Sequence, residues 1–303
     1  MGFAAKGMMM TPATAVKREQ LRLFMARALA GETAVKAVIG IGSIATGRMR
    51  ADSDIDAIVF LEPYSDYIVP AEAIWLPDDG SFHSIFSRDE RVQRDGIQLD
   101  FARFDWGQWR KPDFAWPEER LAELGSGWVA YDPTGEVTAV IQTRVVYPEA
   151  LRIARLDEAV TWLDQHLEDG TPEEKWESLG PLIAHDRLQA AYGWLVQGLF
   201  AINGRWRGWR NREMSGLLQL PWLPNDVENR LLLAGNAPTL DYAGYMARVA
   251  ALRGLFADVL QWLQVEGFYG DDPIGEAFIR GAEEPGRAWN MLAWNEQHKQ
   301  QKV

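Results

Sequence analysis

Two aspartates carry the clearest chemical signal in the chain. Asp54 and Asp56 stand two residues apart at the start of the β-branched run 54–61. Residues two apart on a strand point to the same face, so both carboxylates would project from one side of a sheet. Two neighbouring carboxylates repel each other unless a cation lies between them, and Mg²⁺ prefers oxygen ligands of this kind. The pair therefore predicts a magnesium site.

A third carboxylate would complete a site for two metal ions. Asp100 is the candidate, because it lies in the run 97–104, where apolar and polar residues alternate as on a half-buried strand. A solitary buried charge there would be costly, so we expect Asp100 to have a functional partner.

Gly42 and Ser43 stand between two apolar runs, 36–41 and 54–61. A glycine lets the backbone approach a phosphate closely, and the serine hydroxyl adds a hydrogen-bond donor. This order of strand, Gly-Ser turn and Asp-x-Asp strand predicts that phosphate groups and metal-binding carboxylates meet at one place.

The combined pattern of Gly42-Ser43, Asp54-x-Asp56 and Asp100 resembles the polymerase-β-type nucleotidyltransferase superfamily. Ala45, Gly47 and the run 53–56 are also typical of its small-molecule and bacterial members. The resemblance implies two Mg²⁺ ions, ATP or another nucleoside triphosphate as co-substrate, and a set of three catalytic, metal-binding residues: Asp54, Asp56 and Asp100.

The chain departs from that family at one point. Many members carry a basic residue between the serine and the second glycine, whereas this chain has Ile44 and Thr46 there, and Arg48 follows the glycine. From the resemblance, we predict four nucleotide-binding residues in this part of the chain: Gly42, Ser43, Arg48 and Ser53.

Hydrophobic periodicity predicts the elements that would position these residues. A helix is expected at 14–29, and strands are expected at 36–41, 54–61, 97–104 and 127–131. Beyond residue 148 the pattern is helical, with helices at 150–167, 182–201, 241–265 and 274–297. The fold class expected is α+β (mixed α/β): a nucleotidyltransferase domain at 1–148, with a small mixed sheet flanked by helices, and an all-α helical bundle at 149–303 for substrate binding. A mixed α/β domain followed by a helical domain resembles the architecture of aminoglycoside and lincosamide nucleotidyltransferases.

The composition of the chain argues against several classes of function. The 303 residues are 47% hydrophobic and carry a net charge of −12. An acidic chain is a poor match for nucleic acid, whose binding draws on Lys and Arg, and suits a cationic small molecule better. No cysteine is present, which excludes disulfides and a cysteine nucleophile. No apolar run predicts a membrane span, and the lack of cysteine leads us to expect a cytoplasmic protein. The sequence leaves open whether translation starts at Met1 or at Met8, Met9 or Met10.

The helical part contributes weaker candidates. The segment 205–212 holds four arginines and two tryptophans, and we predict that Arg205 and Arg207 contact the triphosphate; the alternative is a surface loop whose arginines pair with local carboxylates. His185 and Asp186 are predicted to contact the acceptor, with a local helix-capping role as the alternative.

The function expected is adenylyl transfer to a hydroxyl of a small molecule, with an aminoglycoside-like or lincosamide-like antibiotic as the leading acceptor. The alternatives are a protein-modifying transferase that places AMP on a partner, and a non-catalytic nucleotide-binding module. The sequence leaves the acceptor, the general base and the oligomeric state open.

Overall fold

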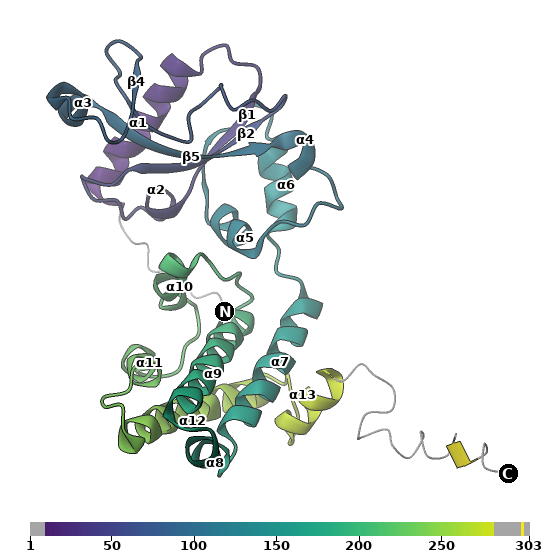
Figure 1. The fold of residues 1–303 in the computed structure, drawn as a ribbon. Helices are drawn as coiled ribbons and strands as arrows, with labels where there is room; N and C mark the ends of the chain where they lie inside the picture. The colour runs from purple at the N-terminus through teal and green to yellow at the C-terminus, as the bar shows by residue number, and fades with distance from the viewer. Residues whose placement is uncertain (1–9, 282–297, 300–303) are drawn as a thin grey trace. The chain divides into compact units, whose positions relative to one another are not determined.

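The computed structural model describes residues 10–281 and 298–299, and Figure 1 shows the fold. These residues form two compact units that divide between Val146 and Tyr147, close to the boundary expected after residue 148. The first unit is mixed α/β and the second is helical, so the predicted fold class is confirmed. In the described part of the chain, no helix is long and apolar enough to cross a membrane.

The first unit is built on a six-stranded mixed sheet with the order β4-β3-β5-β2-β1-β6. Strands β2 and β5 run parallel, and the other described neighbours run antiparallel. Four strands match the predicted ones: β1 (Val35–Gly40), β2 (Ile55–Leu61), β5 (Ile97–Asp105) and β6 (Trp128–Tyr131). Two were not predicted, β3 (Glu72–Trp75) and β4 (Phe82–His83), because runs of four and two residues show no readable period.

Helix α1 (Pro12–Ala28) covers one face of this sheet, and α5 (Glu118–Gly125) lies on the other side (Figure 1). Under α1, Leu21 and Phe24 are fully buried in one core cluster with the inward side chains of β2 and β5. On the opposite face, Phe60 packs edge-on against the ring of Trp106, with centroids 5.4 Å apart. The sheet therefore has an apolar layer on each face.

The first unit contains further short helices. They are α2 (Gly42–Thr46), α3 (Glu90–Asp95), α4 (Trp106–Trp109) and α6 (Glu136–Arg144).

The second unit consists of helices around a single apolar core. Its helices are α7 (Glu149–Leu167), α8 (Thr171–Leu179), α9 (Pro181–Ile202), α10 (Arg210–Leu217), α11 (Val227–Gly235), α12 (Tyr242–Val265) and α13 (Pro273–Gly281). Leu163, Leu195 and Leu252 lie in the core, with at most 1% of each residue exposed. The predicted long helices correspond to α7, α9 and α12. The last one begins as α13, and its predicted remainder, residues 282–297, lies outside the described residues.

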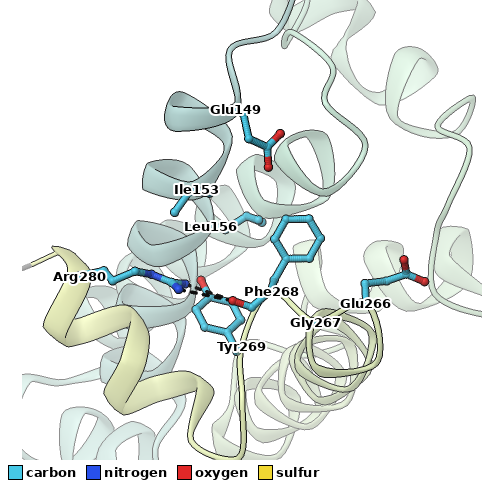
Figure 2. A pocket seen from close by; sticks show the side chains of 8 residues that line it. All are labelled: Glu149, Ile153, Leu156, Glu266, Gly267, Phe268, Tyr269 and Arg280. Carbon is cyan, nitrogen blue, oxygen red and sulfur yellow. Dashed lines mark hydrogen bonds between the residues drawn. The ribbon is translucent and has the colours of Figure 1, made fainter.

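A pocket of about 270 Å³ opens in the second unit (Figure 2). Three segments line it: α7, the turn that follows α12, and α13. Phe268 and Tyr269 form its aromatic wall, and Arg280 reaches the Phe268 carbonyl from α13. Behind the wall, Asp157 is 3% exposed and accepts hydrogen bonds from the Tyr269 hydroxyl at 2.7 Å and the Arg280 guanidinium at 2.9 Å. This ion pair attaches α13 to α7.

Candidate functional site

The three predicted carboxylates lie together where the first residues of β2 pair with β5. One oxygen from each of Asp54, Asp56 and Asp100 lies within 4.8 Å of the others. Asp56 and Asp100 are register partners on the parallel strands, so their side chains leave the same face of the sheet. Asp54 directly precedes β2. The parallel pairing of β2 and β5 therefore brings Asp100 beside Asp56.

The environment of Asp100 differs from the one expected. Ile97, Leu99 and Phe101 are buried as predicted, but Asp100 is exposed, so its description as a buried charge was wrong. Asp100 lies on the other face of β5, at a point that the apolar layer of that face leaves open to solvent. Its pKa is nevertheless raised above the ordinary carboxyl value, first by partial desolvation and then by the negative charge of Asp54. The positive charge of Arg120, on α5, opposes this shift.

The Gly42-Ser43 turn begins next to Asp56. The Ile41 N–H donates to the Asp56 carbonyl at 3.0 Å, and the chain then turns through Gly42, whose φ of 62° is left-handed. Such a φ is unfavourable for any residue with a Cβ, which explains the glycine. Gly42 and Ser43 are the first two residues of α2, which ends at Thr46 and is capped by Gly47 with φ 79°. Backbone pairing thus places the predicted phosphate-binding turn beside the carboxylates.

The other two predicted nucleotide-binding residues of this segment follow α2. Arg48 is exposed. The Ser53 hydroxyl accepts the Arg50 N–H at 3.1 Å and so closes a local turn. Their contact with a nucleotide stays a prediction.

Two basic residues of α1 near this segment were missed. Burial lowers the pKa of Lys17, while the charges of Asp54 and Asp52 raise it, so this ammonium group lies within electrostatic reach of the carboxylates. The Arg18 guanidinium donates to the Ile44 carbonyl at 2.8 Å. Helical spacing in the sequence could have pointed to Lys17 and Arg18, because each lies one helical turn from both Thr14 and Leu21, which are buried.

The remaining predicted residues belong to the second unit. Arg207 pairs with the nearly buried Glu213, with Nε and Oε1 2.8 Å apart, which is the local pairing named as the alternative. Arg205 is exposed. Their role in nucleotide binding stays a prediction.

His185 lies in the second turn of α9, and its Nδ1 is 3.0 Å from an Arg248 nitrogen. Its ring packs between Trp176 and Tyr245, with centroids 5.9 Å and 5.3 Å away. Asp186 is exposed. An acceptor-binding role for the pair also stays a prediction.

Comparisons with known proteins find similarity only at the level of solved structures. No protein-family model matches the chain, and no curated protein matches it. Among solved structures, the chain is similar to a nucleotidyltransferase-like protein from Exiguobacterium sibiricum. The sequence identity is 12% and the TM-score 0.39, over 89% of this chain and 81% of that one.

Proposed function

We propose that the chain is a Mg²⁺-dependent nucleotidyltransferase that transfers a nucleoside monophosphate, AMP from ATP, to a hydroxyl of a small molecule. The observation that carries this proposal is the convergence of Asp54, Asp56 and Asp100 within 4.8 Å, next to a left-handed glycine turn. The hydrogen bond from the Ile41 N–H to the Asp56 backbone carbonyl joins the chain just before the turn to β2.

The donor set fits magnesium. Oxygen ligands about 2.1 Å from one Mg²⁺ lie roughly 3–4 Å apart, so carboxylate oxygens within 4.8 Å need only small side-chain rotations to share an ion. In the proposal, Asp54 and Asp56 hold two Mg²⁺ ions, and Asp100 completes the site. Bound Mg²⁺ would lower the pKa of the acceptor hydroxyl and offset the charge that develops on pyrophosphate.

The residues of the chain then have separate roles. Gly42 and Ser43 hold the β- and γ-phosphates through backbone N–H groups and the serine hydroxyl. The acceptor oxygen forms a bond to the α-phosphorus as the bond to the bridging oxygen breaks, and pyrophosphate leaves with that oxygen. In the proposal, Asp100 also accepts the hydroxyl proton as the general base.

The acceptor is proposed to bind through the second unit. The net charge of −12 favours a cationic, polyhydroxylated molecule, and an aminoglycoside-like or lincosamide-like antibiotic has that chemistry. In this proposal residues 1–148 carry the catalytic site and residues 149–303 select the acceptor.

Release of pyrophosphate from Mg²⁺-ATP, measured across a panel of aminoglycosides and lincosamides, tests the proposal. We expect release with at least one acceptor and none from Asp54→Asn. Folded protein that releases no pyrophosphate with any acceptor and binds no Mg²⁺-ATP would overturn nucleotidyl transfer. Binding of Mg²⁺-ATP without release would overturn only the acceptor class. An AMP adduct on a cellular protein, seen by mass spectrometry, would favour the protein-modifying alternative.

A further inference from the structure

Arg18 connects helix α1 to the segment that follows the Gly42-Ser43 turn. Its Nε and Nη2 donate to the Ile44 carbonyl at 3.1 Å and 2.8 Å, and Nη2 also donates to the Ala45 carbonyl at 3.1 Å. One guanidinium therefore satisfies two carbonyls at the C-terminal end of α2, which is 26 residues away along the chain.

Helix α2 needs such a partner because it has only five residues. One turn of helix is unstable by itself, since nucleation fixes several dihedral angles for a single hydrogen bond. Its last carbonyls also have no partner within the helix. A cation at this end is favourable for the helix dipole, and the planar fork of arginine can bond two carbonyls at once.

The guanidinium is itself held in place. It lies over the Trp128 ring of β6, 4.5 Å from the centroid, which is favourable for a cation. A Cβ on Gly40 would come within 2.9 Å of that ring and 3.0 Å of the Ile44 side chain. The glycine thus lets Trp128 and Ile44 pack closely against β1, and Arg18 rests on the indole.

The turn is consequently fixed at both ends. Directly before Gly42, the Ile41 N–H donates to the Asp56 carbonyl of β2. Directly after Ser43, the Ile44 carbonyl accepts from the Arg18 guanidinium of α1. We infer that Arg18 is a positioning residue that holds the Gly42-Ser43 turn in its phosphate-binding geometry without contacting the nucleotide. This inference rests on the proposed function, because it assigns phosphate binding to the turn.

The test compares Arg18→Met with Arg22→Met. Arg22 also lies over Trp128, at 5.3 Å, but its described hydrogen bonds lead to Glu19 and not to α2. Three properties of each folded variant are measured: the Kd for Mg²⁺-ATP by calorimetry, the Kd for Mn²⁺ alone by electron paramagnetic resonance, and amide hydrogen exchange at residues 43–48. Arg18→Lys, which keeps the charge but lacks the fork, is the conservative variant.

For Arg18→Met we expect about tenfold weaker Mg²⁺-ATP binding, unchanged Mn²⁺ binding and faster exchange at residues 43–48. Arg22→Met should match the wild type in all three, and Arg18→Lys should be intermediate. Equal Mg²⁺-ATP affinity of wild type and Arg18→Met would overturn the inference, as would a parallel loss of Mn²⁺ binding. If Arg18→Met does not fold, Arg18→Lys is the test variant. Wild-type affinity for Mg²⁺-ATP in Arg18→Lys would then overturn the role of the paired guanidinium hydrogen bonds. A wild type that binds no Mg²⁺-ATP overturns the proposed function, and the inference with it.

Discussion

Asp56 and Asp100 occupy the same register position on the parallel strands β2 and β5. Parallel neighbours at one register position lie about 4.8 Å apart, and both side chains leave the same face. The separation of the two carboxylates is therefore set by backbone hydrogen bonds and not by a loop. Without a cation, this arrangement places negative charges close together and costs stability.

Asp56→Asn is predicted to weaken Mn²⁺ binding at least about tenfold and to make the metal-free protein more stable than the wild type, because the substitution relieves repulsion among the three carboxylates. Electron paramagnetic resonance measures the first effect and thermal unfolding in chelator the second. Glu72→Gln is the matched control, since Glu72 is the register partner of Asp100 on β3 but is not in the group of three. Wild-type Mn²⁺ affinity in Asp56→Asn would rule out the metal site.

Thr14→Val is predicted to destabilise the first unit by about 1–3 kcal/mol. Thr14 is fully buried, and its hydroxyl accepts the Met49 N–H at 2.9 Å. Valine has nearly the same shape but leaves that buried N–H without its partner. Chemical denaturation measures the loss, and Thr14→Ser, which keeps the hydroxyl, is expected to retain more of the stability. Equal denaturation midpoints for Thr14→Val and wild type would show that this hydrogen bond contributes nothing.

Four of the six strands and the Asp54-Asp56 pair were readable from local signals. Alternation from Ile97 to Phe101 predicted β5, and the spacing of Asp54 and Asp56 predicted two carboxylates on one side of a strand. The parallel pairing of β2 with β5 has no comparable signal, because it depends on how the chain between them folds. That chain includes β3 and β4, which are too short to show a period.

The role of Arg18 could not be predicted from the sequence around it, because this role also depends on contacts with a distant part of the chain. Its spacing from Thr14 and Leu21 shows that it flanks the buried side of α1. Its partners, however, are backbone carbonyls of α2, and every residue type has a carbonyl. A side chain that bonds to a distant backbone leaves no mark on the sequence of that backbone. The prediction that Asp100 is buried was wrong for another reason. Alternation shows which residues of a strand share a face, but not how deeply other residues cover that face.

Asp157→Asn is predicted to lower the stability of the second unit by about 2 kcal/mol. Asp157 accepts from both Tyr269 and Arg280, and asparagine would leave the Arg280 charge without its carboxylate. Tyr269→Phe removes only one hydroxyl, so we expect a loss of about 1 kcal/mol. Urea denaturation followed by circular dichroism measures both variants. A larger loss for Tyr269→Phe than for Asp157→Asn would show that the ion pair is the weaker part.

The stability of the second unit is predicted to fall as the pH is lowered through 6.5, the ordinary pKa of histidine. Burial, followed by the charge of Arg248, lowers the pKa of His185 below its ordinary value of 6.5. Burial and Arg187 lower the pKa of His166 in the same direction. Between each lowered pKa and 6.5, the unfolded chain binds more protons than the folded one, so the free energy of unfolding increases with pH in that window.

His185→Gln isolates the contribution of His185, because glutamine offers the Arg248 guanidinium an acceptor that does not titrate. We expect a flatter dependence of the unfolding free energy on pH in this variant, and a flatter one still when His166→Gln is added. Urea denaturation at a series of pH values measures the slope. Unchanged slopes in His185→Gln would mean that its imidazole titrates alike in the folded and unfolded chain, contrary to its burial beside a cation.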